Sequence, residues 1–373
     1  MRVALLLLLA SKATGLTVPQ GLAATQLRPA VAHVNFQTSQ LSAHAAFEAA
    51  VQLCEERAAA PAGAAALSAD VPWLLRRCFD ADFENIIRDG TKLVTNVTCM
   101  MPLDVAAGSR CFDNDLVQLP LRPGRVCDGG CCSGACSRVI LPDFLSRDEA
   151  YSFRDQLDNV MVPIEEHPHH NLYLMSCAAA GNVRTTLSFV RIVEKLRRMI
   201  AHEYGLDLSS LAPKQTFVSR LSCESADASS QPVHCDESSH GCFHYSTVLY
   251  LSTQGEEFDG GSFAFTDPSD DDDGIHSRSG ERRVMSGLSP QSGLAVAFSS
   301  GWENLHYVEP ITSGVRYAMP TFFSTVAREE MVRRPVAVDD DAVIAEELWR
   351  CCLMPESEDD FRRLLREWHW LLA

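Results

Sequence analysis

Short apolar runs alternate with turn-forming residues between about Phe217 and Ser324, and this pattern dominates the chain. The runs contain FHYSTVLYLST, FDGGSFAFTD, SGLAVAFSSGW and GVRYAMPTFF, separated by Gly, Pro, Asp and Ser. Runs of β-branched and aromatic residues divided by turn residues are typical of antiparallel sheets. The pattern therefore predicts an all-β core over residues 215–326.

Helical periodicity appears on both sides of this core. Residues 185–205 place apolar side chains on one helix face and end at a glycine, which predicts a helix that packs against the sheet. Ser146 and Glu149 form a capping-box pattern for a shorter helix. Residues 41–60 and the final FRRLLREWHWLLA also have helical spacing. The expected fold class is α+β, with helices that brace a β-rich core.

Changes in composition divide the chain into five segments. Residues 1–18 form a predicted signal peptide, and residues 19–126 form an Ala-rich, mostly helical N-terminal region with a linker. A cysteine cluster occupies residues 127–137, the domain with the β-rich core occupies 138–326, and a linker with a C-terminal helix occupies 327–373. We expect the last helix to dock on the body of the protein. Dimerisation and contact with a membrane surface are the alternatives.

The N-terminal segment indicates the compartment. Arg2, an apolar stretch and small residues form a signal-peptide pattern. This predicts the secretory pathway, meaning the endoplasmic reticulum lumen, the Golgi or the extracellular space, with a signal-anchored membrane protein as the alternative. No later apolar run is long enough to span a bilayer, so we expect no transmembrane span beyond the N-terminal signal. Asn96, in Asn-Val-Thr, begins a glycosylation acceptor sequence that fits this compartment.

Cysteine content and net charge bear on the bonding of the cysteines and on the partners of the chain. All 14 cysteines follow the signal segment, which in an oxidising compartment predicts disulfides. Cys127, Cys131, Cys132 and Cys136 lie close together and would suit zinc in a reducing compartment, which is the alternative. The formal net charge of −17 argues against a nucleic-acid partner, because such proteins need a basic surface.

Three residues of the β-rich core form a candidate metal site. His234 and Asp236 are two positions apart, so a strand would turn both side chains to the same face. His306 must come from another strand. Two histidines and one carboxylate form the facial triad of non-haem Fe(II) oxygenases, which leaves coordination positions open for a 2-oxo acid and O2. We therefore predict iron on His234, Asp236 and His306.

Arg316 is a candidate anchor for an anionic co-substrate. A turn after His306 would bring the chain back on an adjacent strand, so that Arg316 points into the same cavity. A planar guanidinium suits a carboxylate that it binds through two hydrogen bonds. Tyr250, on a neighbouring predicted strand, could share that carboxylate.

Each of these signals is weak when taken alone. A His-x-Asp pair occurs by chance, a histidine in a strand is usually structural, and an arginine after a turn is usually a solvated surface charge. A second group, His167, His169 and His170, lies in a predicted loop, and we expect a surface or substrate-rim segment there rather than a metal site. The metal prediction depends on the combination of triad, strand context and Arg316.

These motifs together resemble a known family. TFVSRLS, HYSTVLYLST, EEFDGGSFAF, SGWENLHYVEP and GVRYAMPTFF are similar to the prolyl 4-hydroxylase-type Fe(II)/2-oxoglutarate dioxygenases, over about residues 138–325. The resemblance implies a double-stranded β-helix, or jelly-roll, core with iron on the triad. It also implies 2-oxoglutarate anchored by Arg316 and Tyr250, and a dependence on ascorbate. Many members have a Tyr in the strand before His-x-Asp and a Lys in place of Arg316. This chain has neither, so the resemblance implies the reaction type but not the identity of the substrate.

The functional hypothesis is a dioxygenase that hydroxylates a protein or peptide with O2 and 2-oxoglutarate and releases succinate and CO2. A prolyl-type peptidyl hydroxylase of the secretory pathway is the leading form. The alternatives are an oxygenase that acts on a small molecule or glycan, and a non-catalytic binding subunit. Substrate contacts are expected from residues 160–180 and 266–283.

Overall fold

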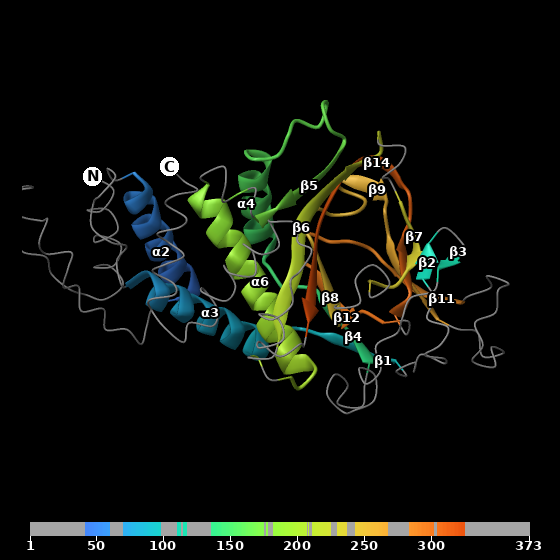
Figure 1. The fold of residues 1–373 in the computed structure, drawn as a ribbon, viewed down its shortest axis with the longest axis horizontal. Coiled ribbons are helices and arrows are strands. Elements are labelled where there is room, and N and C mark those ends of the chain that lie inside the picture. Colours follow the sequence, from blue (N-terminus) through green and yellow to red (C-terminus); the bar gives the residue numbers. More distant parts are fainter. Residues whose placement is uncertain are drawn as a thin grey trace, which may run out of the picture. The chain divides into compact units, whose positions relative to one another are not determined.

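A computed structural model shows the fold of the chain (Figure 1). It describes residues 42–59, 70–97, 110–112, 115–117, 136–174, 177, 182–206, 208, 211–224, 230–236, 243–267, 283–301 and 304–324. The chain divides into two units, Met1–Leu41 and Ser42–Ala373, and all described residues belong to the second. The predicted signal peptide, most of the cysteine cluster, the tip of the 266–283 segment and the C-terminal helix lie outside the described residues.

A large antiparallel sheet forms the centre of the described chain. Its strands follow the order β1-β4-β12-β8-β14-β6-β5, and β9 pairs with the first part of β14. The strands are β1 (Leu93–Val97), β4 (Cys136–Leu141), β5 (His169–Tyr173), β6 (Ala212–Ser222), β8 (Tyr245–Tyr250), β9 (Phe258–Gly260), β12 (Ala295–Ser299) and β14 (Ile311–Ser324).

A smaller antiparallel sheet faces the inner side of the large one. Its order is β11-β10-β13-β7, with β7 (Gln231–His234), β10 (Phe263–Asp267), β11 (Arg283–Leu288) and β13 (His306–Val308). A separate hairpin joins β2 (Arg110–Phe112) to β3 (Asp115–Val117). The predicted antiparallel β-rich core with associated helices is confirmed, and two facing sheets are consistent with a jelly roll.

Apolar side chains from both sheets meet between them. The large sheet contributes residues such as Val296, Phe298 and Ala318, and the small sheet contributes Phe263 and Phe265. Phe263 and Phe298 pack with ring centroids 5.9 Å apart, and Phe265 and Phe298 are at 5.2 Å. Because strand side chains alternate between faces, this aromatic layer fixes which side chains point into the space between the sheets.

Helices lie on the opposite face of the large sheet. They are α4 (Arg147–Asp158) and α6 (Val183–Glu203), while α2 (Ala43–Ala58) and α3 (Asp70–Asp89) pack against α6 and against each other. Figure 1 shows α4 and α6 on one side of the large sheet and the small sheet on the other. The predicted capping box of α4 is present, with Ser146 and Glu149 each bonding the backbone of the other. None of the helices in the described ranges is long and apolar enough to cross a membrane.

The end of α6 is fixed to the sheet. The Tyr204 hydroxyl donates to the Ser137 carbonyl of β4 at 2.7 Å, and its ring lies 4.7 Å from that of Tyr245. Gly205 follows with φ +64°, a left-handed conformation that glycine adopts at low cost. The predicted brace helix therefore ends where the sequence placed its stop, and it packs against the sheet as expected.

One local prediction was wrong. The segment with His169, His170 and Asn171 forms strand β5 rather than a loop. It pairs with β6 in the register Leu172↔Val218, and the ring of Tyr173 packs 5.4 Å from Phe217. Sheet pairing and side-chain packing therefore override the local turn preferences of this segment.

A buried ion pair attaches the N-terminal helix α3 to α6. Asp82 is 4% exposed and accepts two hydrogen bonds from Arg191, at 2.7 and 2.8 Å. Burial would lower the pKa of Arg191, but the carboxylate of Asp82 holds it above its ordinary value. Removing the carboxylate would leave a buried cation without this partner.

We expect Asp82→Ala to lower the free energy of unfolding by about 3 kcal/mol, as for other broken buried pairs. The matched control is Asp80→Ala, which removes the bond to Arg198 at a carboxylate that is 44% exposed and should cost less than about 1 kcal/mol. Urea denaturation monitored by circular dichroism measures both. Equal losses for the two variants would show that the buried pair does not attach the N-terminal helices.

Candidate metal centre and its pocket

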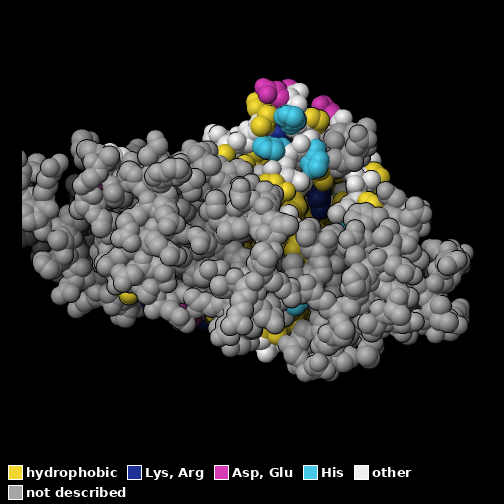
Figure 2. All heavy atoms as spheres, in the orientation of Figure 1, with side chains coloured by type: hydrophobic (Ala, Val, Ile, Leu, Met, Phe, Trp, Pro, Cys, Tyr) yellow, Lys and Arg dark blue, Asp and Glu magenta, His cyan; other side chains and the backbone are white. Residues whose placement is uncertain are grey.

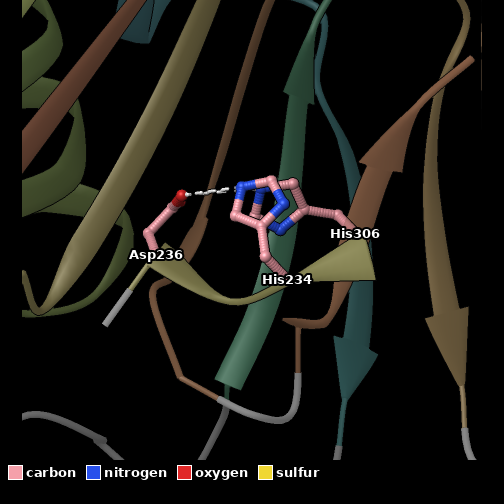
Figure 3. A group of neighbouring side chains, drawn as sticks. All are labelled: His234, Asp236 and His306. Carbon is pink, nitrogen blue, oxygen red and sulfur yellow. Dashed lines mark ion pairs between the residues drawn. The ribbon is translucent and has the colours of Figure 1, made fainter. Parts of the chain in front are cut away.

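Strand register brings the two predicted histidines together. β7 and β13 pair antiparallel with His234 directly opposite His306, and their ring centroids are 4.3 Å apart. Asp236 follows β7 and turns its carboxylate toward both rings (Figure 3). Its Oδ1 lies 3.4 Å from Nε2 of His234 and 3.6 Å from Nε2 of His306. The three residues predicted as iron ligands therefore occupy one site.

Backbone carbonyls orient both rings. Nδ1 of His234 lies 2.8 Å from the Pro232 carbonyl, and Nδ1 of His306 lies 2.8 Å from the Asn304 carbonyl. Because a carbonyl only accepts, each Nδ1 must carry the proton. The lone pair on each Nε2 is then left for a metal, and the partner of the other nitrogen sets the tautomer, as is usual for metal-binding histidines.

Burial and mutual interactions set the charges of the triad. Burial lowers the pKa of His306 to about 4, with Asp236 acting in the opposite direction. Burial alone would raise the pKa of Asp236, but the two histidines and the Ser246 hydroxyl hold it below its ordinary range. Burial also opposes protonation of His234, but its hydrogen bond with Asp236 raises its pKa. At neutral pH a carboxylate therefore lies beside a neutral His306, the protonation states that metal ligands need.

Arg316 reaches the same space from the opposite sheet. His306 lies on β13 of the small sheet, whereas Arg316 lies on β14 of the large one. The chain does return on the next strand after a turn, as expected, but that strand belongs to the other sheet. The residues from Ile311 to Gly314 pair with β9 instead, so the chain crosses between the sheets after Val308. Arg316 and His306 consequently face each other across the cavity.

Two buried polar atoms near Arg316 lack a partner. The Nε of Arg316 and the hydroxyl of Tyr250 make no hydrogen bond within the described part of the chain. The guanidinium lies 5.3 Å from the centre of the Tyr250 ring. Burial raises the pKa of Tyr250 to about 12 and lowers that of Arg316, with each group opposing the shift of the other. The guanidinium and the phenol interact with each other, and the Nε of Arg316 is left without an acceptor in the described part of the chain. Because buried donors are normally paired, this Nε points to an acceptor that comes from a ligand.

A cavity of about 430 Å³ connects the triad with Arg316. Its inner wall includes Val248, Phe263 and Ala318, so the reacting end is largely apolar. Its outer wall includes the exposed His169 and the half-buried Asn171, whose side chains lie 3.2 Å apart. A site of this size and polarity can hold a small dicarboxylate together with part of a larger substrate.

One member of the second histidine group, His169, lines this cavity. His167 and His169 are exposed and His170 is half-buried. Figure 2 shows histidine and acidic side chains gathered on one face at the top of the view, near β5. Among the described residues, the triad is the only group of three or more histidine, cysteine or acidic side chains arranged to hold a metal. We expected a surface or substrate-rim loop here. His169 does line the cavity, but its segment is a strand rather than a loop, and a contact with substrate stays a prediction.

Several residues near the site were missed by the sequence analysis. A Cβ added to Gly261 would lie 3.1 Å from Cδ of Arg316, so this glycine makes room for the arginine. Arg138 donates to the Asn304 side chain at 2.7 Å, close to the carbonyl that orients His306. Asn304 lies two positions before His306, and this spacing in the sequence could have identified it as a neighbour of the metal ligand. Arg138 gives no local signal, because its partner is 166 residues away.

The donor set fits Fe(II). One ligand atom from each of His234, Asp236 and His306 lies within 4.8 Å of the others, and all three residues are buried. Two imidazoles and a carboxylate on one side of a cavity leave the other side of the metal open. Arg316 lines the same cavity, and its buried Nε donor, which has no partner among the described residues, fits the carboxylate of a 2-oxo acid.

Comparison with known proteins gives a consistent result. Residues 222–324 match the family model of the 2OG-Fe(II) oxygenase superfamily. A human protein called 2-oxoglutarate and iron-dependent oxygenase domain-containing protein 3 is 34% identical over 220 residues, which is 52% of this chain and 64% of that protein. Prolyl 3-hydroxylase 1 from Rattus norvegicus is 30% identical over 189 residues, which is 46% of this chain and 23% of that protein.

Solved structures also match, although less closely. The viral collagen prolyl hydroxylase from Paramecium Bursaria Chlorella virus-1 aligns with a TM-score of 0.36 and 16% identity, over 53% of this chain and 93% of that one. The chain spans less than two thirds of the length of the two relatives above, the human protein and the rat prolyl 3-hydroxylase.

We expect Asp236→Ala to weaken Mn(II) binding by more than roughly 100-fold. Loss of a residue that only supports a metal ligand costs roughly 10- to 100-fold, and Asp236 is itself a ligand. The carboxylate supplies the only negative charge of the triad. Titration followed by electron paramagnetic resonance of free Mn(II) measures the affinity. Asp155→Ala, at an exposed position on α4, should bind as the wild type does. Similar Mn(II) affinity in the Asp236 and Asp155 variants would exclude a metal at this triad.

Proposed function

We propose that this chain, whose residues 222–324 belong to the 2OG-Fe(II) oxygenase superfamily, is an Fe(II)- and 2-oxoglutarate-dependent dioxygenase that hydroxylates a protein or peptide. The dioxygenase domain spans residues 138–326 in this proposal. One observation carries it: the triad and Arg316, whose buried Nε has no hydrogen-bond partner in the described part of the chain, line one cavity from opposite sheets.

The metal is held by His234, Asp236 and His306 in this proposal. Iron(II) with 2-oxoglutarate supplies the O2 chemistry that hydroxylates a C–H bond, with release of succinate and CO2. The protein contributes the ligand geometry, since the Pro232 and Asn304 carbonyls fix both rings. It also excludes water, because all three ligands are at most 7% exposed.

Arg316 and Tyr250 bind the co-substrate. Arg316 is 4% exposed and has no acidic partner among the ion pairs of the described residues. A carboxylate at its guanidinium would satisfy the Nε donor and compensate the burial of the charge. The Tyr250 hydroxyl, which burial keeps protonated, can donate to the same carboxylate.

The substrate enters beside β5 in this proposal. His169 and Asn171 form a polar rim on the outer wall of the cavity, while Phe217, Pro320 and Phe322 supply apolar surface. This mixture suits a peptide segment, whose backbone needs hydrogen bonds and whose side chain needs apolar contact. The similarity to a prolyl 3-hydroxylase supports a prolyl-type target. The signal-peptide pattern supports the secretory pathway, and the chemistry supports ascorbate as the reductant that restores Fe(II).

The second candidate is an oxygenase that acts on a small molecule or glycan. The cavity volume of about 430 Å³ favours it, because the value falls within the range of small-molecule sites. Hydroxylation of a peptide array separates the two candidates. A non-catalytic binding subunit is less well supported, because neither the metal ligands nor the arginine is missing.

We expect the wild type to form a visible charge-transfer band with Fe(II) and 2-oxoglutarate under anaerobic conditions. His306→Ala should abolish the band, because it removes a metal ligand. Arg316→Ala should retain it but require roughly 10- to 100-fold more 2-oxoglutarate, which corresponds to the loss of hydrogen bonds from a charged group. The absence of the band from folded, metal-loaded wild type would contradict the dioxygenase assignment.

We expect Gly261→Ala to weaken 2-oxoglutarate binding by less than the roughly 100-fold that a misplacement of about 1 Å can cost, because the added Cβ would displace Arg316 by only part of that distance. The added Cβ would approach Cδ of Arg316 to 3.1 Å, and Mn(II) affinity should not change. Gly255→Ala is the matched control, since it has φ +82° and no atom within 4 Å of the added Cβ. If Gly255→Ala weakens 2-oxoglutarate binding as much as Gly261→Ala does, then strain in the backbone, rather than displacement of Arg316, explains the loss of affinity.

A further inference from the structure

We propose that Arg138 and Asn304 are positioning residues that hold His306 in its metal-binding orientation through a chain of hydrogen bonds. The inference rests on the proposed function only in taking His306 as a metal ligand. It assigns a role at the metal centre to Arg138, which lies outside the matched segment 222–324.

Asn304 is at the centre of this chain of bonds. Its backbone carbonyl accepts from Nδ1 of His306 at 2.8 Å. Its side-chain amide donates to the carbonyl of Ser299 at 3.0 Å and to the hydroxyl of Ser299 at 2.9 Å. Asn304 is completely buried. The amide therefore fixes the loop between β12 and β13, and with it the direction of the carbonyl that orients His306.

Arg138 determines how the Asn304 side chain is held. Its Nε donates to Oδ1 of Asn304 at 2.7 Å. Because an arginine only donates, the amide oxygen must face Arg138, and the amide nitrogen must then face Ser299. Arg138 and the Ser299 carbonyl thus select the same one of the two orientations of the amide, one from each side.

The Arg138 guanidinium also packs beside the ligand histidine. Its Cζ lies 4.1 Å from the centre of the Phe265 ring. Phe265 is directly opposite His306 in the pairing of β10 with β13, and the two rings are 6.1 Å apart. Arg138 belongs to β4 of the large sheet, so it connects that sheet to the ligand strand of the small sheet through both contacts.

The burial of these groups argues for a specific role. Arg138 is 4% exposed, and placing a guanidinium in such a position is costly unless its donors are bonded. Buried polar networks with all members paired restrict the structure to one arrangement. The Nδ1 of His234 instead meets the carbonyl of Pro232, a residue whose ring restricts its own backbone. The two histidines are therefore oriented by different means.

The test compares Mn(II) affinity, measured by electron paramagnetic resonance, with stability in the absence of metal. We expect Asn304→Ala and Arg138→Met each to weaken Mn(II) binding roughly 10- to 100-fold, the usual effect of losing a partner of a ligand histidine. The visible spectrum of bound Co(II) should change in both variants, because it reports ligand geometry. Arg191→Met is the control, since it breaks a buried ion pair far from the cavity. It should lower the melting temperature and leave Mn(II) affinity and the Co(II) spectrum unchanged.

A double variant tests whether Arg138 acts through Asn304. In the Asn304→Ala background, Arg138→Met should cause little further loss of Mn(II) affinity, because contacting residues in one network are not additive. If Arg138→Met does not fold, Arg138→Lys replaces it, and weaker binding than wild type is again expected. Wild-type Mn(II) affinity and Co(II) spectrum in the single variants would overturn the positioning role. Wild type that binds no metal would overturn the proposed function as well, so the two failures are distinguishable.

Discussion

The pairing of β7 with β13 is the constraint on which the rest of the site depends. In this register His234 lies opposite His306, and a shift by one residue would turn one ring out of the cavity. The strands are only four and three residues long, so their own hydrogen bonds cannot hold the register firmly. The aromatic contacts of His306 with Phe263 and Phe298, at 5.0 and 4.9 Å, supply the missing support. The apolar core therefore sets the geometry of the metal site.

A second constraint is the placement of polar groups inside that core. Asp82 with Arg191, and Arg138 with Asn304, are buried polar pairs whose members satisfy each other. The buried Nε of Arg316 has no such partner in the described part of the chain, and Arg316 also lines the cavity that holds the triad. An unpaired donor in a cavity wall is accessible to a ligand, which is why this group bears on function rather than on the stability of the fold.

The sequence alone predicted the parts of this structure that have local signals. The motif His-x-Asp identified His234 and Asp236 as neighbours, although β7 ends at His234 and Asp236 lies beyond the strand, so alternation along one strand is not what brings them together. The capping box placed the start of α4, and helical spacing placed α6. Long-range pairings left no such signal. The strand at His169 exists because β6 offers an edge, and the crossing from β13 to β14 exists because β9 pairs with Gly314 and its neighbours. Both depend on residues far apart in the chain, so composition and spacing could not reveal them.

Arg138 shows how far the functional unit extends beyond its recognisable motifs. It begins the part of β4 that follows the cysteine cluster, and it links β4 to the metal strands through its contacts with Asn304 and Phe265. The end of α6 is bonded to the same strand by Tyr204. A dioxygenase unit that started at residue 222 would lack both the strand and the arginine. The geometry of His306 therefore depends on segments that precede the matched domain, which favours residues 138–326 as the smallest complete unit.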